Sequence, residues 1–257
     1  ALMAPTEILA TQHFDSFQKE LSKVKITCCL LTGKMKKKNR TNIINNIENG
    51  MISVIIGTHA IIQDDVKFKN LGLVIIDEQH RFGVGQRNKL TCKGRSPHLL
   101  SMTATPIPRT LSITYMGDMD LSIIDELPKN RIPVTTKVIN PERLLRVYSF
   151  IREQIDKGRQ CMIVYPLVEE SEKSDIAAAI EMYQELKEKV FIKNRIGLIH
   201  GKMKSDEKKI IMEKFEKNKI NILIATTVIE VGIDVPNATI MLIEHADRFG
   251  LTQLHQL

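Results

Sequence analysis

The sequence has no long apolar segment. None of its apolar runs approaches the roughly 20 residues that a helix needs to cross a bilayer, and the first residues, ALMAPTEILA, do not have the pattern of a signal peptide. These absences argue against a membrane protein and against a secreted protein. We therefore expect a soluble, cytoplasmic chain without a membrane partner.

Cysteine is scarce, and the four cysteines are not spaced for metal binding. Cys28, Cys29, Cys92 and Cys161 show neither a CxxC pair nor a companion HxxxH pattern, which are the spacings typical of zinc sites. Neither a structural metal nor a disulfide framework is expected. We predict that these cysteines are small residues of the core.

Charged residues are plentiful, and their balance is basic. The 257 residues are 43% hydrophobic and 26% charged, an ordinary proportion for a globular chain. Lysine and arginine number 37 against 30 for aspartate and glutamate, a net charge of +7. The excess lies mainly in the first half, around Lys34, Lys36, Lys37, Lys38 and Arg40. A polyanionic partner is consistent with this charge, and a solvated surface is the alternative.

The chain contains an internal repeat. LLTGKMKKKNRTNIINNIENGMISVIIGT, which starts at Leu30, aligns without a gap on LIHGKMKSDEKKIIMEKFEKNKINILIAT, which starts at Leu198. Both copies read strand, glycine turn, amphipathic helix, strand. The apolar helix face is also shared, with Ile43, Ile44 and Ile47 in one copy and Ile211, Met212 and Phe215 in the other. A spacing this large predicts two similar domains rather than a solenoid.

Short apolar strands alternate with helical segments along the chain. The predicted strands are 26–31, 53–57, 73–76, 99–102, 160–165, 196–199, 220–225 and 239–243. We expect Ser205 to cap the helix of the second repeat, and Asn140 with Pro141 to begin a helix that ends near Lys157. The alternation predicts an α/β fold with two doubly wound parallel sheets.

Prolines mark a boundary between the two halves. The segment DELPKNRIPVTTKV contains Pro128 and Pro133, which discourage regular structure. We predict a first domain of residues 1–127, a linker of residues 128–140 and a second domain of residues 141–257.

Two adjacent carboxylates, Asp77 and Glu78, follow the apolar run Leu73 to Ile76 in LGLVIIDEQHRF. A run of branched aliphatics is typical of a strand that is buried on both faces of a parallel sheet. Acids often end such a strand simply because they are solvated. However, ligands of open α/β sheets lie beyond the carboxyl ends of the strands. One acid could then orient a magnesium ion while the other takes a proton from attacking water.

Several sequence blocks follow one another in a characteristic order. They are APTEILA, GTHAIIQ, VIIDEQHRFGVGQR, SMTATPIPRT, IDELPKNRIPVTT, HGKM and ATTVIEVGIDVPNAT. In this order they resemble the motor core of superfamily two helicases, and in particular the RecG family of branched-DNA helicases. The translocase module of the transcription-repair coupling factor is the alternative. That module shares HRFGV and TATPIPRT, but its box usually carries Glu where this chain has Gln79.

The resemblance implies an architecture and a set of partners. It implies two tandem RecA-like domains of the P-loop NTPase type, which use ATP and Mg²⁺. The DNA partner would be branched, single-stranded or double-stranded, and the activity would serve recombination and repair. A monomer is expected.

The resemblance also implies roles at the nucleotide. Asp77 would hold Mg²⁺ through water, and Glu78 would orient and deprotonate the hydrolytic water. Gln79 and His80 would sense the γ-phosphate. The remaining residues with implied roles are Ser101, Thr103 and Thr105, which would couple the nucleotide and DNA sites, and Gly232 and Asp234, which would meet the nucleotide from the second domain.

Contacts with DNA would go mainly to the backbone, because a motor steps along any sequence. The implied residues are Pro5, Thr6, Gly33, Thr58, Gly201, Thr226 and Thr227. Ordinary loop positions are the alternative for each of them.

The sequence lacks the phosphate-binding loop GxxxxGK(S/T). TGKM and HGKM imitate its end, but Cys28 and Ile196 stand where its first glycine would be. In the family this loop would precede Ala1, and an arginine-bearing motif would follow Leu257. We therefore expect a fragment of a longer helicase, with both domains incomplete at the chain ends. One hypothesis is that the parent protein remodels stalled forks and Holliday junctions; the other is that the isolated chain is catalytically inert and binds DNA weakly without sequence preference.

Overall fold

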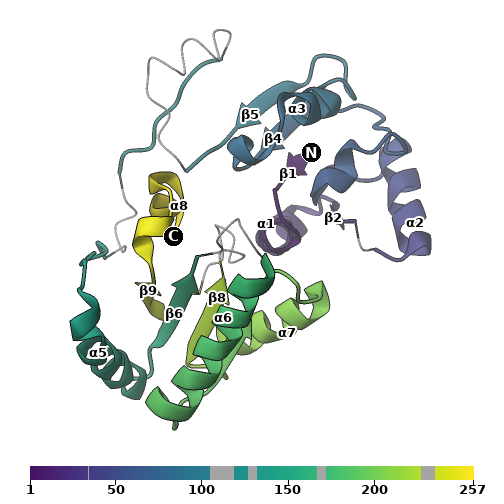
Figure 1. Cartoon of the computed structure of the whole chain (residues 1–257). Coiled ribbons are helices and arrows are strands. Elements are labelled where there is room, and N and C mark those ends of the chain that lie inside the picture. The colour runs from purple at the N-terminus through teal and green to yellow at the C-terminus, as the bar shows by residue number, and fades with distance from the viewer. Residues whose placement is uncertain (34, 105–118, 127–131, 167–171, 227–234) are drawn as a thin grey trace. The chain divides into compact units, whose positions relative to one another are not determined.

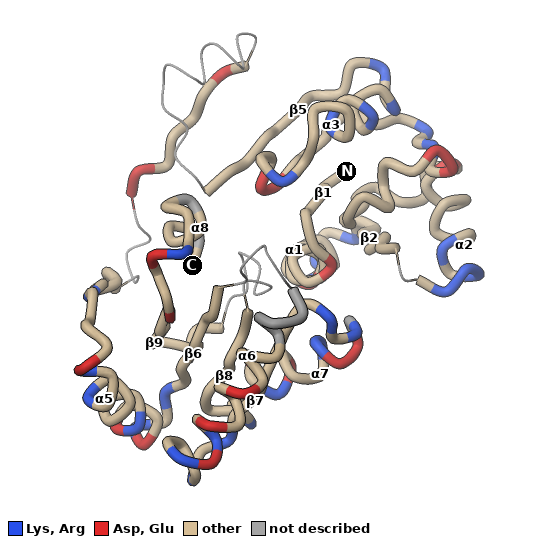
Figure 2. The backbone as a smooth tube through the Cα atoms, viewed as in Figure 1, with Lys and Arg blue, Asp and Glu red and all other residues tan. Residues whose placement is uncertain are grey.

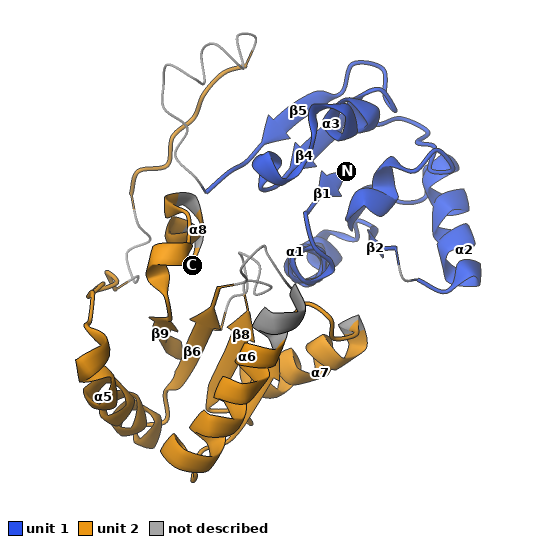
Figure 3. Ribbon diagram, in the orientation of Figure 1, with its two compact units in different colours: residues 1–105, 230–234, 256 blue, residues 106–229, 235–255, 257 orange. Residues whose placement is uncertain are grey.

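A computed structural model describes residues 1–33, 35–104, 119–126, 132–166, 172–226 and 235–257. The chain divides into two compact units, shown in Figure 3. Unit 1 contains strands β1 to β5, and unit 2 contains strands β6 to β9. The predicted boundary between residues 127 and 128 lies outside the described ranges and stays a prediction. Every helix in those ranges is too short or too polar to cross a membrane.

Unit 1 is built on a five-stranded parallel sheet with the order β2-β3-β1-β4-β5 (Figure 1). The strands are β1 (Leu2–Met3), β2 (Cys28–Leu31), β3 (Val54–Gly57), β4 (Leu73–Ile76) and β5 (His98–Ser101). Its helices are α1 (Glu7–Leu21), α2 (Lys37–Glu48) and α3 (Val84–Thr91). Crossover segments are needed because neighbouring strands run in the same direction. The predicted α/β fold is therefore confirmed for this unit.

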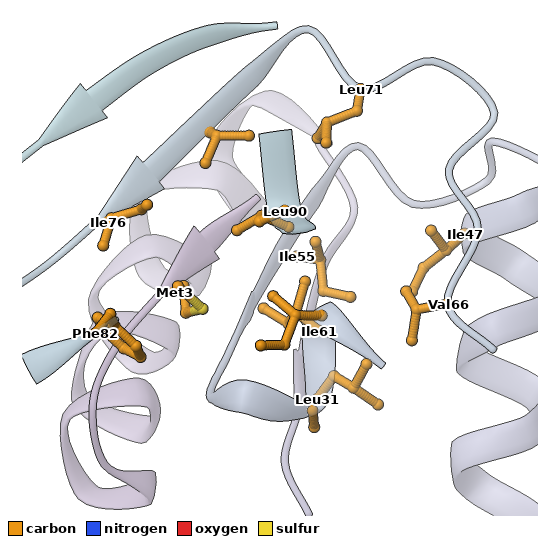
Figure 4. Close-up of a cluster of buried hydrophobic side chains, with 13 residues drawn as sticks. Met3, Leu31, Ile47, Ile55, Ile61, Val66, Leu71, Ile76, Phe82 and Leu90 are labelled. Atoms are coloured by element: carbon orange, nitrogen blue, oxygen red, sulfur yellow. The ribbon is translucent and has the colours of Figure 1, made fainter. Parts of the chain in front are cut away.

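Strand β4 has apolar packing on both faces. Val74 and Ile76 are fully buried in the cluster of Figure 4, and Ile75 packs against the second cluster, which contains Leu9. Burial of each such side chain contributes about 1.5–3 kcal/mol. The prediction of two buried faces is confirmed for these residues. It is wrong for Leu73, which begins the strand and is 46% exposed.

Unit 2 is built on a four-stranded parallel sheet with the order β7-β8-β6-β9. The strands are β6 (Gln160–Tyr165), β7 (Ile196–Ile199), β8 (Ile222–Thr226) and β9 (Ala238–Ile243), and the helices include α5 (Leu144–Asp156), α6 (Glu172–Glu185), α7 (Ser205–Glu216) and α8 (Leu251–Gln256). Every residue of β6 is buried. In the core beside it, the rings of Tyr148 and Phe191 meet edge to face at 5.5 Å. This central strand has the continuous burial that a parallel sheet produces.

The predicted repeat is confirmed as two β-α-β segments. The bounds of α2 and α7 coincide in the ungapped alignment, as do those of β2 and β7. The matching helix residues Ile47 and Phe215 are 3% and 0% exposed. The shared apolar stripe therefore serves the same purpose in both units, which is to hold the helix against its sheet.

The N-cap prediction for α7 is wrong. The helix begins at Ser205, so its N-cap is Lys204. The Lys204 backbone N–H donates to the Glu207 carboxylate at 3.3 Å. An acid in the first turn satisfies this helix end. The predicted helix after Pro141 is confirmed, with Pro141–Arg143 forming a 3₁₀ turn before α5.

The cysteine prediction is only partly right. Cys161 is buried, and Cys28 and Cys29 are half-buried in β2. Burial raises the pKa of the Cys29 and Cys161 thiols to about 12, which keeps them protonated and unreactive. Cys92 is exposed because it lies past the end of α3, as its C-cap.

Candidate active site

Asp77 lies directly after β4, and both of its carboxylate oxygens are engaged. Its backbone N–H donates to the Met3 carbonyl at 3.0 Å and so continues the pairing of β4 with β1. Oδ1 accepts the backbone N–H of Glu78 at 2.9 Å. Oδ2 lies 2.8 Å from Nε2 of His13, on α1. The side chain is 18% exposed, so its orientation is fixed while part of it still meets solvent.

Glu78 is buried and has an unsatisfied oxygen. Its backbone is left-handed, with φ 48° and ψ 54°, and the residue is 7% exposed. Oε2 has no hydrogen-bond partner among the described residues. Nδ1 of His80 lies 3.5 Å away, too far for a good hydrogen bond. A buried carboxylate oxygen in this state is stabilised when water or a ligand donates to it.

Gln79 and His80 occupy the 3₁₀ turn Gln79–Arg81. Gln79 is 6% exposed, and its Oε1 accepts a hydrogen bond from Nη1 of Arg87 at 3.2 Å. Nδ1 of His80 lies 3.5 Å from Oγ1 of Thr103. The structure thus brings all four residues of the predicted box together with Thr103.

Ser101 ends β5, in register with Ile76 at the end of β4. Its hydroxyl is buried without a partner among the described residues. The Met102 backbone N–H donates to the Ile76 carbonyl at 2.8 Å, which keeps the two strand ends side by side. Thr105, the third predicted coupling residue, lies outside the described residues.

A cavity of about 280 Å³ lies beside Glu78. It is lined by Pro5, Thr6, Leu9, His59, Glu78, Arg81, Phe82 and Gln86. Two predicted DNA-contacting residues, Pro5 and Thr6, therefore share a cavity with the predicted catalytic acid. The Thr6 hydroxyl also caps α1, accepting the Leu9 N–H at 3.3 Å. His59, Arg81 and Gln86 were not predicted to belong to the site.

Gly33 and Thr58 lie beyond the ends of two neighbouring strands, β2 and β3. Thr58 is 2% exposed, and its hydroxyl has no partner among the described residues. A Cβ at Gly33 would lie 3.7 Å from Nε2 of His59, which is ordinary contact. His59, which also lines the cavity, therefore connects the two predicted phosphate-contacting residues with Glu78.

In unit 2, fewer of the predicted residues are described. Thr226 ends β8 and is fully buried, and its hydroxyl, like that of Thr58, has no partner in the described ranges. The Gly201 carbonyl accepts a hydrogen bond from Nζ of Lys208 at 3.0 Å. The predictions for Thr227, Gly232 and Asp234 fall outside the described residues and stay predictions.

A second repeat relates the turn after β4 to the turn after β9. His245 is left-handed, with φ 50° and ψ 48°, and is followed by the 3₁₀ turn Ala246–Arg248, as Glu78 is followed by Gln79–Arg81. Both turns run into the pattern RFGxxQ. In each, the glycine N–H donates to the glutamine Oε1 at 3.1 Å: Gly83 donates to Gln86, and Gly250 donates to Gln253. The two copies of this pattern are separated by one residue fewer than the two copies of the first repeat. The ungapped alignment that reveals the first repeat therefore does not pair them.

Glu244 occupies in unit 2 the position that Asp77 occupies in unit 1. Its Oε1 is buried without a partner among the described residues. Burial raises the pKa of Glu244 above its ordinary value. The hydroxyl of Tyr165, at the end of neighbouring β6, is also buried without a described partner, and burial raises the pKa of Tyr165.

The surroundings of Asp77 fit a hydrated magnesium ion. Mg²⁺ keeps several waters and binds through one or two carboxylates plus phosphate groups. Each Asp77 oxygen accepts one protein donor, which leaves lone pairs for metal-bound water. The unsatisfied Oε2 of Glu78 supplies a further acceptor. Since the described residues hold no group of three or more His, Cys, Asp or Glu side chains around an ion, water would supply much of the coordination.

Comparison with known proteins identifies two helicase domains. Residues 1–114 match the DEAD/DEAH box helicase family, and residues 142–257 match the helicase conserved C-terminal domain. The ATP-dependent DNA helicases RecG of Streptococcus pneumoniae and Thermotoga maritima are 53% and 49% identical to the chain, over 100% of its length. Over its whole length, the chain is therefore similar to a segment of the RecG helicases.

Solved structures agree with this assignment. A RecG bound to a three-way DNA junction covers 100% of the chain with 46% identity and a TM-score of 0.77. Dbp5 of S. cerevisiae bound to RNA and ADP BeF3 covers 93% with 18% identity and a TM-score of 0.64, which supports the RecA-like fold. The chain spans about a third of its RecG relatives, 38% of the S. pneumoniae protein and 33% of the T. maritima protein.

Proposed function

We propose that the chain is a motor segment of an ATP-dependent DNA helicase that remodels branched DNA, such as stalled forks and Holliday junctions. The observation that carries the proposal is the pair of acids after β4. Asp77 is oriented through both oxygens, and Glu78 presents a buried, unsatisfied oxygen beside a cavity. A metal-assisted hydrolytic site uses an oriented acid to hold the ion and an available acceptor for the proton of the attacking water.

Asp77 and Glu78 divide the chemistry between them. Mg²⁺, when bound, neutralises charge that develops on the phosphates. Asp77 would hold it through water, and the fixed carboxylate would limit the positions that this water can take. Glu78 would accept the proton of the attacking water at Oε2, which accepts no hydrogen bond from the described residues and has Nδ1 of His80 3.5 Å away.

The neighbouring polar residues would report the state of the nucleotide. We assign γ-phosphate sensing to Gln79 and His80, and we assign coupling to Ser101, Thr103 and Thr105. Nδ1 of His80 and Oγ1 of Thr103 lie 3.5 Å apart, so the two sets of residues adjoin each other in unit 1. Gly232 and Asp234 would meet the nucleotide from the second domain, as the family implies.

DNA would be held mainly through its phosphates. The proposed contacts are Pro5, Thr6, Gly33, Thr58, Gly201, Thr226 and Thr227. The unsatisfied hydroxyls of Thr58 and Thr226 support this assignment, because a buried hydroxyl is stabilised by a hydrogen-bonding ligand. Basic residues on α2 and just before it (Figure 2) would raise the local DNA concentration electrostatically. The solved RecG bound to a three-way junction is consistent with branched DNA as the ligand.

The test uses the full-length protein that carries this chain. ATP hydrolysis is measured with and without a three-way DNA junction, for wild type, Asp77→Asn and the surface control Glu153→Gln. We expect DNA-stimulated hydrolysis in wild type and in the control, and a loss of at least about 100-fold in Asp77→Asn. A hydrolysis rate that does not change when DNA is added, or that is unchanged in Asp77→Asn, would contradict the proposal.

A second experiment concerns the chain by itself. Because its sequence contains no phosphate-binding loop, we expect no DNA-stimulated ATPase and only weak binding of DNA that falls steeply with salt. Turnover that Glu78→Gln abolishes would show that the loop is dispensable. Binding that does not change with ionic strength would exclude a backbone-contact mode.

A further inference from the structure

His13 reaches Asp77 from a different element of unit 1. Nε2 of His13 lies 2.8 Å from Oδ2 of Asp77, although 64 residues separate them in sequence. The two side chains are 27% and 18% exposed. A contact of this length between partly buried groups is a hydrogen bond of ordinary geometry.

The fold fixes the position of His13. Helix α1 follows β1 after the short segment 4–6 and is capped by Thr6, and β1 pairs with β4, which leads into Asp77. Leu9 and Ala10 bury the inner face of α1. His13 stands one turn further along that face, at the i+4 and i+3 positions from these residues. The same packing that anchors α1 therefore places the imidazole at the end of β4.

The His13 contact completes the orientation of the Asp77 carboxylate. The Glu78 N–H alone holds Oδ1 and would leave the group free to tilt about that bond. The donor at Oδ2 removes this freedom. Glu244, at the matching position of unit 2, has a buried oxygen without a described donor. Among the residues that the structure describes, a donor on each carboxylate oxygen is therefore seen at Asp77 and not at Glu244.

We propose that His13 is a positioning residue for Asp77: its Nε2–H donates to Oδ2 and holds the carboxylate in the orientation that a hydrated divalent cation requires. The inference rests on the proposed function. It gives His13 no contact with substrate, and it predicts that the residue acts on metal use rather than on the chemistry of water attack. Mutation of outer-shell partners of a metal site typically changes metal affinity or activity 10–100-fold.

The hydrogen bond between His13 and Asp77 is tested by NMR on the 257-residue chain. Long-range ¹H–¹⁵N spectra identify which ring nitrogen carries the proton. We expect His13 to carry it on Nε2, with chemical shifts that change in Asp77→Ala and not in Ser16→Ala, an exposed position on α1. If the His13 ring signals do not change in Asp77→Ala, the inference is overturned. This result would not depend on ATP hydrolysis.

The positioning role is tested in the full-length protein by titrating Mg²⁺ in the ATPase assay. His13→Ala should raise the Mg²⁺ concentration for half-maximal rate about 10-fold or more. His13→Gln, whose amide N–H has similar reach, should recover much of this loss, and Ser16→Ala should match wild type. An unchanged Mg²⁺ midpoint in His13→Ala contradicts the inference alone. Absence of any DNA-stimulated hydrolysis in wild type contradicts the proposed function instead.

Discussion

The turns after β4 in unit 1 and after β9 in unit 2 share a backbone and differ in chemistry. Glu78 and His245 have nearly the same left-handed φ, 48° and 50°. Both turns are closed by RFGxxQ, and both bury its phenylalanine, Phe82 and Phe249, to 8% exposure. Ahead of this shared pattern, unit 1 carries DEQH and unit 2 carries EHAD.

The comparison distinguishes the features that form the turn from the side chains that we propose to act in hydrolysis. Because His245 adopts the same conformation without a second acid, the left-handed backbone at Glu78 belongs to the turn and is not by itself a sign of catalysis. Among the described residues, the features that distinguish unit 1 are the two donors on Asp77 and the acid at the left-handed position, Glu78, where unit 2 has His245. The proposed function therefore depends on the side chains, because the backbone of this turn occurs in both units.

The largest difference in stability should come from a buried polar pair. Gln79 and Arg87 are hydrogen-bonded in unit 1, whereas Ala246 and Leu254 occupy the matching positions in unit 2. Arg87→Leu leaves the Gln79 amide oxygen buried without its donor, so the free energy of unfolding of unit 1 should fall by about 1–3 kcal/mol. Chemical denaturation that follows unit 1 measures this loss.

The double variant Gln79→Ala/Arg87→Leu places in unit 1 the two residues that unit 2 has at the matching positions. It should recover most of the stability, since both polar partners are removed together, but it should not recover ATP hydrolysis in the full-length protein. A double variant as unstable as Arg87→Leu would mean that the two turns are not interchangeable as structures.

Replacing either of the two capping glutamines should cause a smaller loss of stability, and the loss should be the same in both units. Gln86→Ala and Gln253→Ala each remove one side-chain acceptor from a glycine N–H, and each should cost about 0.5–1 kcal/mol. Thermal unfolding of the two variants gives the comparison. Unequal losses, with one near zero, would show that only one of the turns depends on its cap.

The smallest effect concerns Glu244, the acid of the unit 2 turn, whose Oε1 is buried without a partner among the described residues. Burial raises the pKa of Glu244 above 4.5 in the folded state, so its contribution to stability is full below pH 4.5 and is lost as pH rises through the folded pKa. Glu244→Gln should therefore be slightly more stable than wild type at pH 7, by less than about 1 kcal/mol after solvent screening. The gain should vanish below pH 4.5 in melting curves recorded against pH.

Most of the fold was predictable because parallel strands are continuous apolar runs. All eight predicted strands are present, each end within two residues of its prediction, and the first repeat marks both domains. The N-cap of α7 was mispredicted by one residue, because the helix already includes Ser205 and Glu207 in its first turn accepts the Lys204 backbone N–H. Local sequence preferences do not settle which of two neighbouring polar residues completes a helix end.

The candidate site was predictable only where residues are close in sequence. Asp77, Glu78, Gln79 and His80 form one motif, and the structure gathers them. His13 was missed because its contact with Asp77 depends on the pairing of β1 with β4, which no local pattern encodes. Arg87 was missed because its partner is a buried amide, and the second repeat was missed because its spacing differs from that of the first.

The most direct measurement compares ATP binding and ATP hydrolysis in full-length Glu78→Gln and His245→Gln. Glu78→Gln should bind ATP as wild type does and hydrolyse it at least about 100-fold more slowly, because the proton acceptor is lost. His245→Gln, at the matching position of unit 2, should keep both properties. Wild-type hydrolysis in Glu78→Gln, or an equal loss in His245→Gln, would contradict the assignment of the hydrolytic site to the turn of unit 1.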